Sequence, residues 1–237
     1  MQVLIALIVC VSVWFVVNFA YQVMRKPTEL FFPVSGVLNK TPEATWDAYG
    51  SIFVRHSTAT VSPELLAALA QAEGAGNPVA RTYWRWSFTS RPFEVYKPAS
   101  SAVGMYQITD GTFQIARRYC VHRHVVVEDG PWDDWQSCWF NALYSRVIPS
   151  NAVEMTAALL DRQIAGILAG KSSPGPTQLH ALAAVIHLCG AGEGARFARR
   201  GFRILPGQTC GDHSVAGYVA RIAAFDRKFA ALRAGDE

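Results

Sequence analysis

The first 24 residues constrain the fold more than any other segment, because they are almost wholly apolar and no charge occurs before Arg25 and Lys26. A helix of this length is about long enough to cross the hydrocarbon core of a bilayer. A cleaved signal peptide is the alternative, but it needs a basic start and small residues before the cleavage site, which Asn18-Phe19-Ala20 does not provide. We therefore predict that residues 1–24 form a transmembrane anchor or an uncleaved signal.

The rest of the chain reads as a linker followed by one domain. Residues 25–45 are interrupted by three prolines and a glycine, and residues 46–237 are enough for one folded domain with its own core. Helical periodicity dominates that domain, and only residues 121–128 suggest a short strand or an extended loop. The expected fold class is mostly α, with helices over 62–73, 110–120, 131–147, 150–170, 176–190 and 213–233.

The chain is mildly basic, with a formal net charge of +4. This charge suits an anionic polymer or an anionic surface as a partner. Lys and Arg do not cluster as they do on a nucleic-acid-binding face, so we expect no nucleic acid among the partners.

Four cysteines lie outside the apolar segment, namely Cys120, Cys138, Cys189 and Cys210. An even number is typical of two disulfides in an oxidising compartment, and buried reduced thiols are the alternative. Arg25 and Lys26 point the other way, because positive charges beside an apolar segment favour the cytoplasmic side. The chain has no Cys-x-x-Cys pair, and His122-Arg123-His124 lacks an evident third ligand, so no metal is expected.

One glutamate stands at the end of a predicted helix in apolar surroundings. Ser62 and Pro63 begin this helix and Gly74 ends it, which places Glu73 in the last turn. The partial negative charge at that helix end favours the protonated form of the carboxyl group. Such a group suits general acid catalysis, and a solvated surface glutamate is the alternative.

Three further segments follow Glu73 in a recognisable order. Pro78 and Ala80 come shortly after it, a glycine-methionine-tyrosine-glutamine turn with a later threonine comes next, and a small-residue helix and a Tyr-Val pair close the series. The residues concerned are Gly104, Met105, Tyr106, Gln107, Thr112, Ala184 to Gly190, Tyr218 and Val219. In order and spacing, from about Leu65 to Phe225, they resemble the soluble lytic transglycosylase family, lysozyme-like enzymes that cut the glycan strands of bacterial peptidoglycan.

The resemblance implies a lysozyme-like domain behind a transmembrane helix, and a chemistry that needs one carboxyl group and no cofactor. Glu73 would protonate the glycosidic bond, the N-acetyl group of the substrate would assist, and Glu73 would then activate the sugar's own 6-hydroxyl to close an anhydro ring. The substrate-binding residues would be Gly104, Met105, Tyr106, Gln107 and Tyr218. Asp110 and the pair Asp133-Asp134 are weaker candidates for a second carboxylate, because each suits a helix start.

The chain departs from the family pattern in three places. Gly74 stands where a serine is usual, and His187 stands near the position of an asparagine. Residues 81–98, here called the aromatic insert, add Tyr83-Trp84-Arg85-Trp86 and Phe88 between the first two motifs. Aromatic rings stack well on sugar faces, so this insert either lines the glycan groove or packs as an ordinary loop. A hydrolytic muramidase similar to goose-type lysozymes and a non-catalytic envelope scaffold are the alternative functions.

The same resemblance fixes the expected location and partners. Peptidoglycan lies outside the cytoplasm, so we expect a single-pass inner-membrane protein whose domain faces the periplasm. Its partners would be glycan strands and the inner membrane, and an envelope-spanning secretion or pilus machine is a further candidate. Disulfides between neighbours along the chain, Cys120 with Cys138 and Cys189 with Cys210, would suit that compartment.

Overall fold

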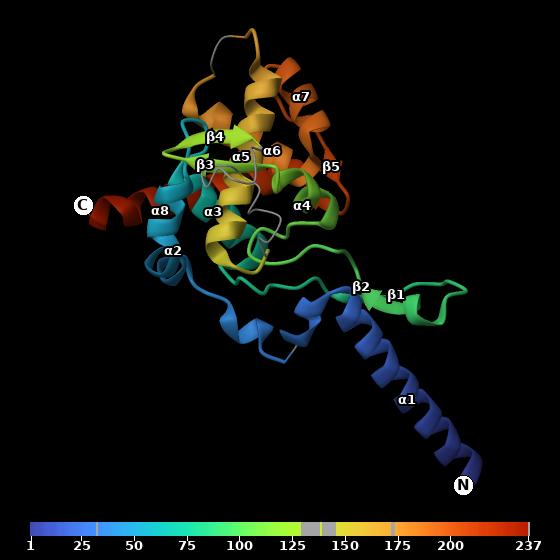
Figure 1. Cartoon of the computed structure of the whole chain (residues 1–237). Helices are drawn as coiled ribbons and strands as arrows, with labels where there is room; N and C mark the ends of the chain where they lie inside the picture. Colours follow the sequence, from blue (N-terminus) through green and yellow to red (C-terminus); the bar gives the residue numbers. More distant parts are fainter. Residues whose placement is uncertain (32, 129–137, 139–145, 172–173, 237) are drawn as a thin grey trace.

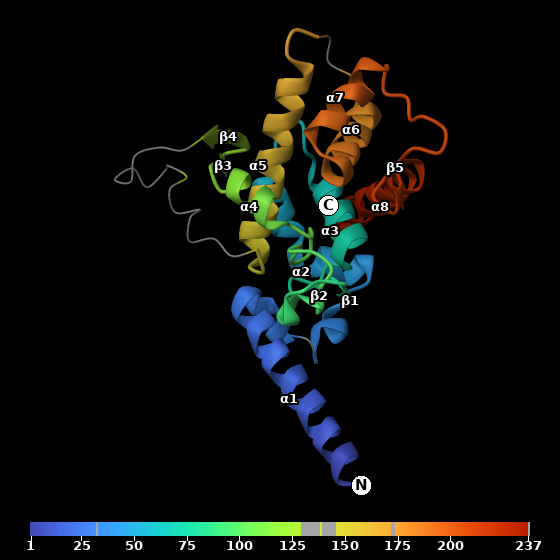
Figure 2. The ribbon, with the colours of Figure 1, turned by 90° about the vertical axis from the view of Figure 1, so that its right-hand side faces the viewer.

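The apolar segment forms a single helix that projects from the rest of the molecule. A computed structural model of the chain describes residues 1–31, 33–128, 138, 146–171 and 174–236. Helix α1 (Gln2–Arg25) extends away from the other helices, with the N-terminus at its far end (Figures 1 and 2). Within the described residues, α1 is the one helix long and apolar enough, by length and composition, to cross a membrane.

Helix α3 (Pro63–Gly74) lies at the centre of the domain. Its side chains from Leu65 to Ala70 are all buried, because it packs against α2 (Pro42–His56) on one side and α8 (Val215–Asp236) on the other. Ser62 begins α3 by accepting a hydrogen bond from the backbone N–H of Leu65 at 3.2 Å. The buried apolar residues in the middle of α3 and the cap at its start determine where the C-terminal end of the helix leaves the core.

Four more helices complete the core around α3. Helix α5 (Pro149–Leu168) packs against α2 and α6, and the short α4 (Asp110–Ala116) packs on α5. Helices α6 (Pro176–Cys189) and α7 (Ala191–Arg199) lie side by side (Figure 2). The core they share contains residues of every one of these helices, which makes the domain mostly helical, as predicted.

Strands occur only as small antiparallel hairpins in the described part of the chain. Strand β1 (Trp84–Trp86) pairs with β2 (Tyr96–Pro98), and β3 (Tyr119–His122) pairs with β4 (Val125–Glu128). Strand β5 (Thr209–Cys210) pairs with β6 (His213–Ser214). The described residues also form three short 3-10 helices, namely η1 (Pro27–Phe31), η2 (Ser35–Leu38) and η3 (Pro92–Glu94).

The predicted helices correspond to α3, α4, α5, α6 and α8, with shifted ends. Helix α4 ends at Ala116 rather than at residue 120, because Tyr119 already pairs in β3. Residues 213 and 214 belong to β6 instead of the last helix. The segment 121–128 contains parts of two strands, joined at Arg123 and His124, which both have positive φ. The predicted helix over 131–147 lies mostly outside the described residues, and residues 146 and 147 form a turn.

The segment expected to be a linker, residues 25–45, contacts the domain along its length. It contains η1, η2 and the first turn of α2. The Asn77 side chain donates hydrogen bonds to the Ser35 carbonyl and to Asn39 Oδ1, the latter at 2.9 Å, and Lys40 N–H donates to the Ala75 carbonyl at 2.8 Å. These bonds hold the segment against the end of α3.

A buried carboxylate ties α1 to the domain. Glu29 in η1 is fully buried, and its Oε1 atom lies 3.2 Å from Lys26 Nζ. Its Oε2 atom accepts hydrogen bonds from Arg81 and, at 2.8 Å, from the Trp84 indole N–H. Two cations and an indole compensate the desolvation of this carboxylate, and breaking one contact would leave a buried charge poorly compensated. The chain that follows α1 is therefore held against the domain at Glu29.

Both predicted disulfides are present. Cys120 in β3 is bonded to Cys138, and Cys189 at the end of α6 is bonded to Cys210 in β5, each with a Cα–Cα distance of 5.5 Å. Cys10, in α1, is a free and exposed thiol. The second disulfide joins the end of α6 to the hairpin that precedes α8, two helices that flank the end of α3.

Candidate active site

Glu73 lies in the last turn of α3, at the point where the central helix leaves the core. The helix ends at Gly74, and Ala75 follows in a left-handed conformation with φ of 49°. The Glu73 side chain is about one-fifth exposed, so it is neither solvated nor sealed in the core. A carboxyl group in this position can meet a ligand and still be held by the protein.

Tyr218 on α8 holds this carboxylate. Its hydroxyl donates a hydrogen bond to Glu73 Oε1 at 2.5 Å, and its ring is buried. Burial, together with the adjacent Glu73 carboxylate, raises the pKa of Tyr218 well above its usual range. The hydroxyl therefore keeps its proton, and the hydrogen bond that it donates orients one oxygen of Glu73.

His187 on α6 lies on another side of the same carboxylate. Its Nε2 atom is 3.9 Å from Glu73 Oε1, and its ring makes an edge contact with Tyr106 at a centroid distance of 6.5 Å. The sequence placed His187 on an apolar helix and gave it no role beside Glu73. The packing of α6 against α8 and the ring contact with Tyr106 hold this imidazole at the site.

The turn that carries the second motif packs against the end of α3. Gly104 has φ of 79°, and a Cβ atom there would lie 2.4 Å from the Arg146 carbonyl, so only glycine fits. Arg146 in turn donates to the carbonyls of Ser101 and Ile108 at 3.0 and 2.9 Å. Gln107 has positive φ as well, and its amide donates to the Gly104 carbonyl at 2.9 Å and to the Ala80 carbonyl at 3.3 Å.

Two residues of this motif belong to the core rather than to an open surface. Met105 is fully buried, and Tyr106 is buried with its hydroxyl donating to the Leu66 carbonyl at 3.0 Å. They fix the turn against α3, while Gln107 follows at the rim of a cavity. Of the six predicted site residues, Glu73 and Tyr218 are in direct contact, and Gly104, Met105, Tyr106 and Gln107 form one turn beside them.

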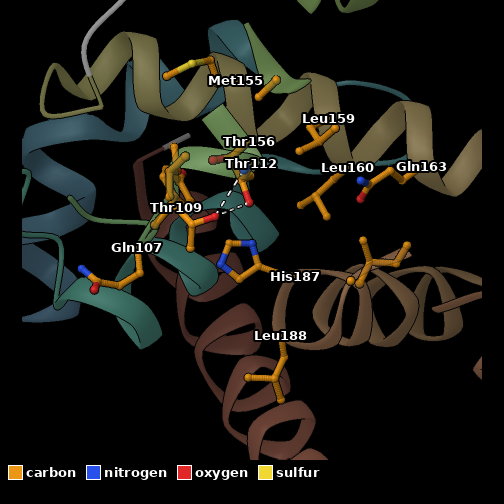
Figure 3. A pocket seen from close by; sticks show the side chains of 15 residues that line it. Gln107, Thr109, Thr112, Met155, Thr156, Leu159, Leu160, Gln163, His187 and Leu188 are labelled. Carbon is orange, nitrogen blue, oxygen red and sulfur yellow. Dashed lines mark hydrogen bonds between the residues drawn. The ribbon is translucent and has the colours of Figure 1, made fainter. Parts of the chain in front are cut away.

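Two cavities flank the Glu73 and His187 pair. The first, about 310 Å³, lies between α5, α6 and residues 106–112, and the side chains of Thr109, Thr156 and His187 point into it (Figure 3). The second, about 410 Å³, has Glu73 in its wall, together with Gln71, Asn77, Arg81 and other residues of the α3 end. The Glu73 carboxylate thus lines the second cavity, and His187, 3.9 Å away from it, lines the first.

Other acidic and metal-binding candidates are engaged elsewhere. Asp110 begins α4 and forms an ion pair with Arg146 at 2.8 Å, while Asp133-Asp134 lie outside the described residues. His124 contacts the Ser57 carbonyl at 2.9 Å, and His122 lies by the disulfide sulfur of Cys120 at 3.4 Å. In the described ranges, no three His, Cys, Asp or Glu side chains gather where they could hold a metal ion.

The aromatic insert does not line these two cavities apart from Arg81 at its first position. Its rings pack against α1 instead: Trp84 stacks on Phe19, and Trp86 stacks on Trp14, with centroid distances of 6.1 and 6.5 Å. Of the two interpretations of the insert, a glycan-lining role at Glu73 has no geometric support among these contacts.

Known proteins add nothing to this geometry. Comparison of the chain with protein-family models, with curated proteins and with solved structures finds no match. The function is therefore proposed from the site and from the order of the sequence motifs.

Proposed function

We propose that the chain is a peptidoglycan lytic transglycosylase that cleaves the β-1,4 bond between N-acetylmuramic acid and N-acetylglucosamine with Glu73 as its single catalytic acid and base. The observation that carries this proposal is the carboxyl group at the end of α3, which is hydrogen-bonded by the buried Tyr218 hydroxyl, lines one cavity and lies 3.9 Å from His187 of a second cavity. A polymer that crosses both cavities would pass over this group.

The surroundings of Glu73 suit a reaction with one carboxyl group. Glu73 first protonates the leaving glycosidic oxygen, while the N-acetyl group of the substrate assists at the anomeric carbon. Glu73 then accepts the proton of the muramyl 6-hydroxyl, which attacks the same carbon and closes a 1,6-anhydro ring. Attack by a group of the same sugar is favoured entropically over capture of water.

The neighbouring residues have separable roles in this proposal. Tyr218 fixes the orientation of the carboxylate, because its proton is not available for transfer. Gln107, Thr109 and Gln163 line the first cavity and offer amide and hydroxyl groups to the acetamido groups of a glycan. Met105 and Tyr106 act through packing, as positioning residues.

We further propose that α1 anchors the enzyme in the inner membrane with the domain in the periplasm. The length and apolar composition of α1 support an anchor, and the two disulfides favour an oxidising compartment. The substrate is found on that side of the membrane. A secretion or pilus machine that must open the peptidoglycan layer is a candidate partner.

The decisive experiment replaces Glu73 by glutamine, which keeps the size of the side chain and removes the transferable proton. We expect release of muropeptides from purified sacculi to fall by about 10²–10⁴-fold. Glu43→Gln is the matched control, because Glu43 is an exposed partner of Lys228 and lines neither cavity. Release at the wild-type rate by a folded Glu73→Gln variant would contradict the assignment.

The products separate this reaction from its alternatives. Mass spectrometry of the wild-type products distinguishes anhydro ends, which we expect, from the reducing ends left by a hydrolytic muramidase. An envelope scaffold would release neither product.

A further inference from the structure

The surface of the aromatic insert combines exposed rings with basic charge. Phe88 is fully exposed, and Tyr83 and Trp86 are 68% and 61% exposed. The insert contains four basic residues and one acidic residue, and Glu94, the acidic one, is paired with Arg25, Arg91 and Lys97. A soluble surface rarely presents large rings side by side without a binding role.

The insert packs on the C-terminal half of α1, from Trp14 to Arg25. The Asn18 side chain donates to the Tyr96 carbonyl at 2.8 Å, and the Gln22 side chain donates to the Phe93 carbonyl at 2.5 Å. These two amides are buried, so the polar groups within the apolar helix face the insert. Ring contacts continue from Trp14 to Tyr21, and an ion pair at Arg25 closes the series.

These contacts determine the depth of the insert in a bilayer. At 1.5 Å per residue, α1 is about 36 Å long, and the hydrocarbon core needs about 20 of its residues. A core that starts at Gln2 therefore includes Trp14 and Phe19. Trp86 and Trp84 stack on these residues and share their depth.

We propose that the β1–β2 hairpin is a membrane-inserted element, which lies in the outer leaflet beside α1 and binds phospholipid. Tyr and Trp are enriched at the interface between hydrocarbon and headgroups, and basic residues near the surface attract anionic lipids. The pairing of β1 with β2 satisfies the backbone groups that face the partner strand, and Asn18 and Gln22 of α1 donate to two further carbonyls of the insert. Arg91 lies near the end of α1, because Arg91 and Arg25 both pair with Glu94.

A cavity at the junction gives the lipid a place. It has a volume of about 360 Å³ and lies between α1 and the insert, where its walls include Phe15, Phe19, Tyr83 and Trp84. Aromatic walls beside a membrane-spanning helix suit an acyl chain. The Oδ1 atom of Asn18, also in the wall, is buried without a hydrogen-bond partner.

The proposal rests on the proposed crossing of the membrane by α1, but it does not need the lytic activity. Its test uses the full chain in vesicles of phosphatidylethanolamine and phosphatidylglycerol. An environment-sensitive fluorophore is attached at Phe88→Cys or at the matched surface control Leu205→Cys, both with Cys10→Ala, and the quenchers are spin-labelled lipids. We expect a blue shift and loss of most emission for the probe at 88, and neither change at 205.

Three other results would overturn the proposal. One is a probe at 88 that stays as unquenched as the probe at 205. A probe at Trp86→Cys repeats the measurement in the strand that stacks on α1, so that the result does not depend on the turn alone. A second is a probe that responds to soluble glycan fragments and not to lipid, which would make the insert a sugar platform. A third is a probe at the native Cys10 that deep quenchers do not reach, because then α1 is not inserted at all.

Discussion

At the scale of single residues, the site depends on one hydrogen bond whose partner comes from the far end of the chain. Tyr218→Phe removes the donor to Glu73 and leaves the ring in place. A hydrogen bond to a charged group contributes about 1.5–3 kcal/mol, so we expect the rate of muropeptide release to fall by about 10–100-fold. Steady-state rates on purified sacculi measure this effect.

Tyr106→Phe is the matched control for this variant. Its hydroxyl is equally buried but donates to the Leu66 backbone carbonyl. This change should lower the melting temperature and leave the rate per folded molecule nearly unchanged. Equal rates for Tyr218→Phe and the wild-type protein would show that the bond to Glu73 has no catalytic role.

Gly74, where the lytic transglycosylase pattern has a serine, leaves no room for a side chain. A Cβ atom at this position would lie 2.8 Å from Met105 Cα and 3.1 Å from Ala80 Cβ. We expect Gly74→Ser, which introduces the usual family residue, to destabilise the protein by about 1–3 kcal/mol and to displace the turn that carries Gln107. Thermal unfolding checks this against Gly111→Ser, where a Cβ atom meets nothing within 4 Å. Matching melting temperatures for the two variants would refute the steric explanation.

Sequence reasoning at this scale succeeded where a local signal existed. Ser62, Pro63 and Gly74 mark the two ends of α3, and these ends place Glu73 in the last turn. His187 carries no such signal, because its approach to Glu73 depends on how α6 packs on α8. The contact of Tyr218 with Glu73 spans 145 residues, and the resemblance, not the periodicity, assigned Tyr218 to the site.

At the scale of elements, a buried imidazole joins α2 to α5. His56 Nε2 contacts Ser150 Oγ at 2.9 Å, and its Nδ1 atom lies 3.9 Å from Glu154 Oε1. Burial lowers the pKa of His56 below its ordinary 6.5, although the Glu154 carboxylate opposes this shift. The folded protein therefore holds a neutral ring that the unfolded chain would protonate.

The resulting pH dependence has a definite sign. As the pH falls below 6.5, the unfolded chain binds a proton that the folded protein does not, so the free energy of unfolding decreases until the pH reaches the folded pKa of His56. Denaturant unfolding of the full chain in detergent at about pH 7.5 and about pH 5.5 measures this decrease. His56→Gln should show a smaller decrease than the wild-type protein, and an equal decrease would contradict the account.

Two elements that sequence reasoning missed, α7 and the β1–β2 hairpin, share a physical cause. Helix α7 contains Gly192 and Gly194, which lower helix propensity, yet a Cβ atom at Gly194 would lie 2.4 Å from Ile186. Close packing of α7 on α6 thus outweighs propensity. The β1–β2 hairpin was missed for a related reason. The sequence of residues 81–98 alone indicates a loop, and the hairpin is held by ring contacts with the distant helix α1.

At the scale of the whole molecule, the proposed topology places the two ends of α1 on opposite sides of the membrane. In cells whose outer membrane alone is permeabilised, a membrane-impermeant maleimide should label Leu205→Cys and leave Gln2→Cys unlabelled, both with Cys10→Ala. Labelling of Gln2→Cys after the inner membrane is opened is the control for thiol reactivity. The reverse pattern would place the domain in the cytoplasm and end the assignment to peptidoglycan.

The contacts of Glu29 and Asn77 determine how this enzyme would move. A chain of flexible residues between anchor and domain would let the domain wander through a volume several times its own size. Here the buried carboxylate and the bonds to Ser35 and Asn39 leave no such slack. The domain would diffuse only with its anchor, in a single plane at constant height. The active site of the proposed enzyme would then stay at a fixed distance from the membrane. The spacing between the peptidoglycan layer and the membrane would determine which glycan strands it can reach.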